Sequence, residues 1–537
     1  MSRMSGGHRL AACSQLLLVL AWLATASGCT GSSEPARSDT PDRVDAGQPS
    51  GPICGIDLQL WALEDEELVV PLACASGMAL PRTELELEDA PLALTLDREA
   101  GELRWKPALD QAGDHTVKLR LGAAEVGTLR IGVAERFEHP ENVPIVDPRA
   151  YAHELGLPVF HIEAGQGLNP DAHTPVHMVY EGREIPGTAA KYRGSTSINY
   201  PKRSFTFKFD KHAPFVDEAR GFRGVRRLVL TTNFDDNSGL RQRLAFMLWN
   251  KLAQEHVQIR TFNAVVYLDG QYLGLYQVTD HVDDDLLREQ GFPDGVNLYK
   301  ARTHSANFRM TDDKGRPKTS LRAGYTKEAG LPEDGEPGAY ADLESLVDWI
   351  ANAPPDAFFE AYDARLLRRD FEDWLVFAHM INAGDTTNKN CYLIHDARHD
   401  APDTRWRFVP WDFDVSYGQG FATKRLPANV LELDKLAKRN ELFERQLTDP
   451  RLREPLLERY RDVLKGPWPL EEIVSTLDGW AAEIERAAQR DEVRWRETYL
   501  MYWATQRMDI NRNTHVEEVA YIRRWLHERW SALEAGL

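Results

Sequence analysis

Four polar residues in the last third of the chain have types and an order that suit phosphoryl transfer. Asp385 and Asn390 are five positions apart, and Asp412 and Asp414 follow farther along. In this reaction one carboxylate orients the attacking hydroxyl, while amide and carboxylate oxygens are the hard ligands that Mg²⁺ prefers. We therefore predict Asp385 as the catalytic carboxylate and Asn390, Asp412 and Asp414 as metal ligands. The alternative is a structural calcium site, because Ca²⁺ accepts the same oxygen ligands.

The elements predicted around these residues leave them in loops that can converge. The pattern predicts a helix over 370–381 before the first of them, and strands over 391–395 and 406–410 before the last two. Protein kinases have the same order: a catalytic Asp, a metal-binding Asn five residues later, a strand pair and a metal-binding Asp. Since the Asp–Asn spacing alone arises about once by chance in a chain of this size, the prediction depends on the combination.

Residues 191–208 form a candidate phosphate-binding segment. Gly194 permits a tight turn, and Ser195 with the backbone N–H groups beside it offers donors to phosphate oxygens. Lys202 or Lys208 would supply positive charge, the latter from a strand of alternating apolar and polar residues. The alternative is an ordinary hairpin with solvated lysines.

The next segment predicts a capped helix. Asn237 or Ser238 would cap a helix over 239–252. Arg241 lies in its first turn, where the helix dipole disfavours a cation, so we expect Asp236 to hold it. A structural ion pair is at least as good an interpretation as a catalytic one.

A hairpin and a strand precede a long polar stretch. The dipeptide Asp269-Gly270 predicts the hairpin turn, and residues 296–300 are typical of a strand. Residues 302–340 carry many Gly, Pro, Lys and Asp but few apolar residues. We expect them to form a long mobile excursion over the active site.

The N-terminus predicts export. Residues 1–29 combine basic residues, an apolar stretch over 16–23 and small residues, which is the layout of a secretory signal. The end of this segment resembles a lipobox, in which Cys29 is acylated; the alternative is an ordinary cleaved signal. Residues 30–52, rich in Ser, Pro, Gly and Asp, are expected to form a disordered tether.

Residues 53–136 predict a small β-sandwich. Seven short strand-like runs cover residues 56–61, 67–72, 84–88, 94–97, 103–105, 115–121 and 127–133. The stretch from Leu96 to Gly113 resembles the immunoglobulin-like modules of bacterial surface proteins. A disulfide between Cys54 and Cys74 is plausible in an exported domain, while Cys391 is left as a buried thiol. We favour a spacer over an adhesion module, because no exposed chemistry is evident.

The bulk composition limits the possible partners. A chain of 537 residues with 42% hydrophobic residues should fold into several globular domains. The formal charge of -19 argues against binding to nucleic acid, and an acidic protein that handles phosphate needs a metal ion or a local basic pocket. Outside the signal no run reaches the roughly 18 apolar residues of a spanning helix, so membrane contact is expected through the lipid anchor only.

With these motifs in order, residues 150–537 resemble the CotH family. The shared features are Arg-Gly-x-Ser before Pro-Lys at 193–202, Asp-x-Ser before Arg at 236–241, a Gly- and Tyr-rich hairpin at 270–276, Leu-Tyr-Lys at 298–300, and the Asp…Asn and Trp-Asp-x-Asp pair. The resemblance implies an α+β fold with a two-lobed, atypical kinase-like domain, ATP and Mg²⁺ as cofactors, and phosphorylation of serine in proteins. It makes Lys202 the phosphate-binding lysine. The further candidate nucleotide contacts are Arg193, Ser195, Lys208 and Lys300.

The predicted organisation is a signal over 1–29, a linker over 30–52, an immunoglobulin-like sandwich over 53–136 and a kinase-like domain with C-terminal helices over 137–537. We predict an exported, lipid-anchored protein kinase, facing the periplasm or cell surface, that transfers phosphate from ATP–Mg to Ser or Thr of surface or matrix proteins. The main alternative is a non-catalytic surface protein that keeps the fold as a binding module, with Ca²⁺ at the same carboxylates. A carbohydrate-active enzyme, suggested by 14 Trp and many carboxylates, lacks a convincingly placed carboxylate pair.

Overall fold

A computed structural model describes residues 56–63, 66–74, 84–108, 111, 113–134, 152–165, 167–429, 433–506 and 510–536. The predicted signal, the predicted tether, Cys29 and Cys54 lie outside the described residues. Within them, no helix combines the length and the apolar character needed to cross a membrane.

The seven strands expected in the small N-terminal domain are all present. They are β1 (Ile56–Leu63), β2 (Leu68–Pro71), β3 (Leu85–Glu88), β4 (Thr95–Asp97), β5 (Glu102–Trp105), β6 (Gly113–Leu121) and β7 (Ala124–Ala134). One sheet has the order β1-β7-β6-β3 and the other β2-β5-β4. Trp105 from the second sheet and Leu119 from the first belong to one buried core, which makes the domain a β-sandwich. Cys74 is buried in this core and disulfide-bonded, but its predicted partner, Cys54, lies outside the described residues.

A ten-stranded sheet forms the strand-rich lobe, which we define as residues 152–296. Its order is β10-β13-β14-β17-β19-β18-β9-β11-β12, with β8 paired to β9. The strands are β8 (His153–Glu154), β9 (Leu157–Glu163), β10 (Thr174–Pro175), β11 (His177–Tyr180), β12 (Arg183–Glu184), β13 (Ala189–Arg193), β14 (Ser204–Lys208), β17 (Arg227–Thr231), β18 (Thr261–Leu268) and β19 (Gln271–Asp280). A separate pair, β15 (Phe215–Asp217) and β16 (Phe222–Val225), completes the strands of this lobe. The predicted hairpin turn at Asp269-Gly270 joins β18 to β19.

The two faces of this sheet differ because its strands alternate. Phe205 and Phe207 of β14 lie in the apolar core of the lobe with Leu228 and Leu230 of β17. Thr206 and Lys208 therefore point to the opposite face. That polar face carries several of the predicted site residues. The helix α1 (Arg241–Leu252) follows β17, as expected from the sequence. The predicted cap by Asn237 or Ser238 was wrong, because the helix begins after Leu240 without a side-chain cap, and Asp236 accepts from the Arg241 N–H instead.

The helix-rich lobe, residues 297–465, is built around one central helix. Its sheet has the order β21-β20-β22-β23, formed by β20 (Asn297–Ala301), β21 (Tyr325–Ala329), β22 (Cys391–His395) and β23 (Arg407–Pro410). Its helices are α3 (Ala341–Asn352), α4 (Pro355–Arg365), α5 (Arg368–Met380), α6 (Leu433–Ala437), α7 (Glu441–Thr448) and α8 (Pro450–Lys465). Every residue of α5 from Asp370 onward is buried, which identifies it as the core of the lobe. The thiol of Cys391 is free and buried, as predicted.

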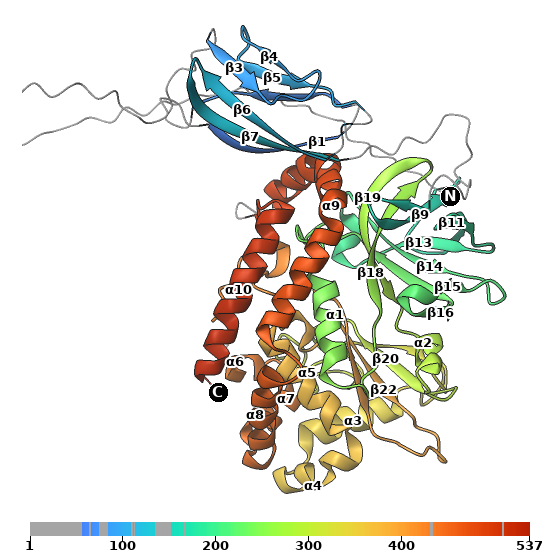
Figure 1. Cartoon of the computed structure of the whole chain (residues 1–537). Helices are drawn as coiled ribbons and strands as arrows, with labels where there is room; N and C mark the ends of the chain where they lie inside the picture. The colour runs from blue at the N-terminus through green and yellow to red at the C-terminus, as the bar shows by residue number, and fades with distance from the viewer. Residues whose placement is uncertain are drawn as a thin grey trace, which may run out of the picture. The chain divides into compact units, whose positions relative to one another are not determined.

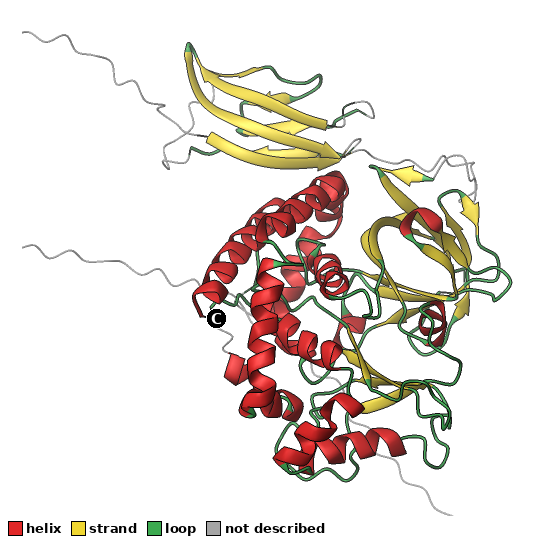
Figure 2. Cartoon of the chain, turned by 60° about the horizontal axis from the view of Figure 1, so that its bottom comes forward, coloured by secondary structure: helices red, strands yellow, loops and turns green. Residues whose placement is uncertain are grey.

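Two long helices close the fold. The helices α9 (Leu470–Gln506) and α10 (His515–Gly536) pack side by side along the body (Figure 1). Asp491 of α9 binds the strand-rich lobe, and Arg529 of α10 donates to the backbone carbonyls of His379 and Met380 in the helix-rich lobe. Figure 2 shows that the helices gather on one side of this body and most strands on the other. The predicted two-lobed α+β architecture is therefore confirmed.

The polar stretch 302–340 is built into the helix-rich lobe rather than extending from it. It contains β21, which pairs with β20, and Phe308 lies fully buried in the main core. Lys327 donates to the backbone carbonyls of Pro332 and Ala339 at 2.7 and 3.0 Å. The expectation of a long excursion was wrong because Phe308, Tyr325 and Tyr340 anchor this stretch in the main core.

Candidate functional site

Asp385 and Asn390 lie in a loop that is held at several points. The loop follows α5 and contains the short 3-10 helix η3 (Gly384–Thr386). Trp374 Nε1 and Asn440 Nδ2 donate to backbone carbonyls of this loop at 2.9 and 2.7 Å. The position of the predicted catalytic carboxylate is thus set by the central helix and by the segment before α7.

Three side chains surround the Asp385 carboxylate. Asn390 Nδ2 donates to Asp385 Oδ2 at 2.9 Å, and Lys389 Nζ lies 2.8 Å from the same oxygen. His304 Nε2 lies 3.6 Å from Oδ1. Asp385 Oδ1 is therefore the less engaged oxygen, and the amide oxygen of Asn390 is the atom that this residue can offer to a cation.

Several residues of the region have left-handed backbone conformations, among them Asn390, Asp412 and Asn233. The φ angles are +53° at Asn390, +68° at Asp412 and +52° at Asn233. Side chains other than glycine adopt this conformation at a cost, which Asn and Asp tolerate best. Such residues concentrate at functional sites, where the surrounding structure holds them in place.

Asp412 and Asp414 lie in the loop after β23, where they meet a carboxylate from the other lobe. The carboxyl groups of Asp414 and Asp235 are close neighbours, and Tyr200 Oη donates to Asp235 Oδ2 at 3.1 Å. None of the described Lys, Arg or His side chains lies within 4.0 Å of the carboxylates of Asp235, Asp412 or Asp414. None of these three carboxylates is therefore paired directly with a described cation, although Arg193 lies next to Asp412.

The ionisation of these groups reflects that crowding. Burial raises the pKa of Asp412 to about 7; Asp414 and Asp385 add to the shift, and Arg193 opposes it. Burial also raises the pKa of Asp414 well above its usual range, and the carboxylate of Asp235 raises it further. The carboxyl groups around Asp412 and Asp414 are thus close enough to disfavour the charge of these two residues.

The gathered groups fit a divalent cation. Asp412, Asp414 and the amide oxygen of Asn390 are hard oxygen donors, the ligand type of Mg²⁺ and Ca²⁺. Asp235 lies beside Asp414, but Asp235, Asp412 and Asp414 do not offer oxygens that all lie within 4.8 Å of one another. A bound cation would remove the mutual repulsion of the carboxylates, so their chemistry and their uncompensated charge both support the prediction from the sequence.

Two of the predicted nucleotide contacts lie beside this loop. The guanidinium of Arg193 lies 5.8 Å from the centre of the Trp411 ring, next to Asp412. The Lys300 ammonium lies 5.1 Å from the centre of the Tyr392 ring. Because the rings of Tyr392 and Trp411 are neighbours, with centres 6.0 Å apart, the two cations border the same site.

Lys202 lies in a different environment. Its ammonium donates to Asp491 Oδ1 at 2.6 Å and to the Leu275 carbonyl at 2.9 Å, and the residue is only 2% exposed. Protein kinases contain a comparable lysine–acid pair. Lys208 is exposed at the end of β14, and Ser195 is exposed after β13. The structure shows no contact between these three residues and the carboxylate site.

A buried arginine ties the two loops of the site together. Arg241 Nη1 donates to Asp236 Oδ1 at 2.5 Å, and Arg241 Nε donates to the Ser416 carbonyl at 3.1 Å. The predicted pair of Arg241 and Asp236 is therefore confirmed. Because one loop carries Asp235 and the other carries Asp414, this arginine helps to set the distance between the two carboxylates.

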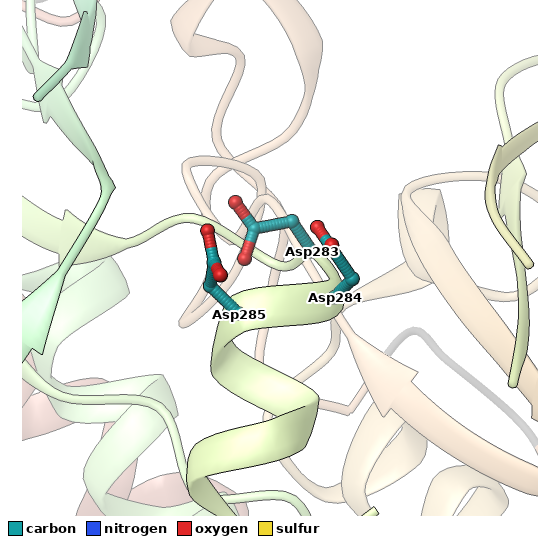
Figure 3. A group of neighbouring side chains, drawn as sticks. All are labelled: Asp283, Asp284 and Asp285. Carbon is teal, nitrogen blue, oxygen red and sulfur yellow. The ribbon is translucent and has the colours of Figure 1, made fainter. Parts of the chain in front are cut away.

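A second acidic group lies at the start of α2 (Asp284–Glu289). Figure 3 shows its members, Asp283, Asp284 and Asp285, which offer oxygens within 4.8 Å of one another. Their charges are compensated: Asp283 caps the helix and lies 3.5 Å from Arg227, and Arg288 lies 2.7 Å from Asp285 and 3.6 Å from Asp284. We interpret this group as structural.

The sequence reasoning missed three residues of the site. Asp235 and Lys389 are each adjacent in the sequence to a residue discussed as part of the site. A charged residue in that position could therefore have been predicted to belong to the site as well. His304 lies in the polar stretch expected to be an excursion, and no local pattern connects it to Asp385.

Comparison with known proteins identifies the family of the chain. A family model described as CotH kinase protein matches residues 190–533. The inner spore coat protein H of Bacillus subtilis (strain 168) is 27% identical over 245 residues, which are 45% of this chain and 62% of that protein. The match therefore spans less than two thirds of that relative's length. With the family model covering more than half of the chain, this protein belongs to the CotH family.

Proposed function

We propose that the protein is an exported, atypical protein kinase that transfers the terminal phosphoryl group of ATP to Ser or Thr of surface or matrix proteins. The observation that carries this proposal is the convergence of Asp385, Asn390 and Asp412 at one place, with Asp414 beside them. These are the residue types that phosphoryl transfer requires, in the order that kinases use.

Each group has a defined part in the proposed reaction. The acceptor hydroxyl oxygen forms a bond to the terminal phosphorus while the bond to ADP breaks, and Asp385 Oδ1 accepts the hydroxyl proton. Asn390, Asp412 and Asp414 would hold Mg²⁺, which when bound neutralises phosphate charge. Arg193 supplies a positive charge for the phosphate oxygens from the strand-rich lobe.

The proposed location rests on the N-terminal segment. Residues 1–29 have the layout of an export signal, and Cys29 would carry the lipid anchor. The relative in Bacillus subtilis is named an inner spore coat protein. We infer a site of action outside the cytoplasm, on proteins assembled there.

Transfer of label from ATP to a serine-rich protein acceptor tests the proposal. Asp385→Asn should lower the rate by about 10²- to 10⁴-fold, because it removes the proton acceptor but keeps the shape of the side chain. Asp284→Asn, in the compensated group on α2, is the matched control and should retain the wild-type rate. Equal rates for wild type and Asp385→Asn, with both proteins folded, would refute the assignment.

A non-catalytic binding module is the second candidate. One observation favours it: Lys389 and Asn390 both occupy Oδ2 of Asp385, an arrangement that a purely structural loop would also use. Calorimetry separates the two candidates, since a binding module would take up Ca²⁺ but show no affinity for ATP in the presence of Mg²⁺.

A further inference from the structure

A group of cations lies on the polar face of the strand-rich lobe. Lys191 and Arg193 are two residues apart on β13 and so share one face. Lys208 of β14 stands opposite Ala189 of β13 and opposite Arg227 of β17 in the strand register, which places it on that same face. Four cationic side chains from three neighbouring strands therefore point in one direction, away from the apolar core.

Two histidines, His173 and His281, lie beside this cationic face, which we define as Lys191, Arg193, Lys208 and Arg227. The register that pairs Thr174 with Ala190 places His173 beside Lys191. Burial lowers the pKa of His173 to about 4, and Lys191, Lys208, Arg227 and His281 lower it further. These groups are therefore close neighbours in space as well as in register.

The charges of this face are largely uncompensated. The carboxylate of Asp283 lies beside this face, 3.5 Å from Arg227 and 3.3 Å from His281. No other described Asp or Glu lies within 4.0 Å of Lys191, Arg193 or Lys208. In a chain with a formal charge of -19, cations gathered without partners indicate a site for an anion.

The cationic face begins at the carboxylate site and extends away from it. Arg193 lies next to Asp412, whereas Lys208 is level with Ala189, four residues farther along β13. At the rise of an extended strand this separation is about 13 Å. The strand register also places Ala189, Ser204, Thr206 and Val229 on this face. Its charged side chains on β13, β14 and β17 are all cations, which favour negative charge.

We propose that the cationic face binds a linear chain of condensed phosphate that continues past the metal site. This proposal rests on the proposed function, because it extends the phosphate site described there. Arg193 and the cation site would hold the end of the chain, and Lys191, Lys208 and Arg227 would bind the phosphates beyond the third. Inorganic polyphosphate and a nucleotide with an extended phosphate tail both contain such a chain, and in either case the recognised groups are phosphates.

Calorimetric titration of the full chain, at constant ionic strength with Mg²⁺ present, tests the proposal. The ligands are inorganic tripolyphosphate, a longer inorganic polyphosphate and ATP. The longer chain should bind about tenfold more tightly than tripolyphosphate, because it reaches the distal cations. ATP, which has only three phosphates, should bind no more tightly than tripolyphosphate. If ATP does bind more tightly, the ratio of the two affinities measures the contribution of its nucleoside.

Charge-removing variants identify the distal contacts. Lys191→Gln and Lys208→Gln should each weaken the longer chain by about three- to tenfold and weaken tripolyphosphate less. Lys208→Arg should restore most of the loss, and Lys465→Gln, at the exposed end of α8, should have no effect. If the longer chain binds no more tightly than tripolyphosphate, or if the two glutamine variants behave like Lys465→Gln, the proposal is wrong.

The outcome is independent of catalysis. Binding that depends on Lys191 and Lys208 would support the phosphate-chain site even if no donor gives phosphoryl transfer. Conversely, transfer from ATP that Asp385→Asn abolishes would support the kinase even if chain length has no influence on affinity.

Discussion

Asp235 and Asp236 are neighbours in the chain but belong to regions with opposite charge balance. Asp236 lies against the guanidinium of Arg241, whose Nη2 also donates to Glu518 Oε1 at 2.5 Å. Asp235 instead faces the carboxyl group of Asp414, with Asp412 nearby and no described cation within 4.0 Å. The compensated network supports the fold, whereas the uncompensated group leaves room for a charge that a ligand would bring.

The acidic group on α2 also shows that partners, rather than the number of carboxylates, distinguish the two kinds of region. Asp283, Asp284 and Asp285 form the tighter cluster, yet each one already has an arginine partner. Density of carboxylates is therefore a poor guide to a cation site in this protein. The absence of partners around Asp412 and Asp414 is the more informative feature.

The largest expected effect comes from breaking the compensated network. Arg241→Leu leaves Asp236 and Glu518 buried without their shared cation, so we expect a loss of about 3–5 kcal/mol in the free energy of unfolding. Urea denaturation at neutral pH measures it. A loss below 1 kcal/mol would show that the network of Arg241, Asp236 and Glu518 does not stabilise the fold as we infer.

The same network predicts a loss of stability in acid. Although burial opposes its ionisation, Arg241 and Arg425 lower the pKa of Glu518 to about 2, below its ordinary value of 4.5. A lowered carboxyl pKa stabilises the fold above the ordinary value and loses that effect as the pH falls toward 2, which amounts to about 3 kcal/mol. Glu518→Gln should be less stable than wild type at neutral pH, and the difference should shrink in acid. A difference that stays constant with pH would contradict this account.

The uncompensated region predicts a change of opposite sign. In metal-free protein, Asp414→Asn removes one of three crowded carboxylates while preserving its shape, so we expect it to stabilise the fold by about 1 kcal/mol. Asp236→Asn is the matched variant in the compensated network and should destabilise the fold. Thermal unfolding with a chelator present compares them, and destabilisation by both variants would remove the distinction between the two regions.

The smallest effect is expected at the acidic group on α2. Arg288 is half exposed, and it pairs with the exposed Asp284 and with the more buried Asp285. Arg288→Ala should therefore lower the free energy of unfolding by less than about 1 kcal/mol. A loss as large as that of Arg241→Leu would mean that this group is a structural centre in its own right.

Local sequence patterns were sufficient to predict the helices and strands, but they did not predict the residues that surround the site. The strand alternation around Phe205, the turn at Asp269-Gly270 and the pair of Asp236 with Arg241 were all predicted, because each depends on residues close in sequence. The order of Asp385, Asn390 and Asp412 was also readable, since loops that follow a helix and two paired strands tend to meet.

The unpredicted features all involve distant parts of the chain. Lys202 is held by Asp491, 289 positions away, and His304 lies beside Asp385 from a stretch that looked unstructured. The meeting of Asp235 with Asp414 depends on how the two lobes pack. Such contacts follow from tertiary structure, which spacing along the chain does not encode.

Cation binding by the uncompensated carboxylates is the most direct test of the central claim. Calorimetric titration with Mn²⁺ or Mg²⁺ should show binding to wild type and to the double variant Asp284→Asn/Asp285→Asn, with at least about tenfold weaker binding to Asp412→Asn. Binding that persists in Asp412→Asn and disappears in the double variant would contradict the account, because it would place the cation at the compensated group on α2.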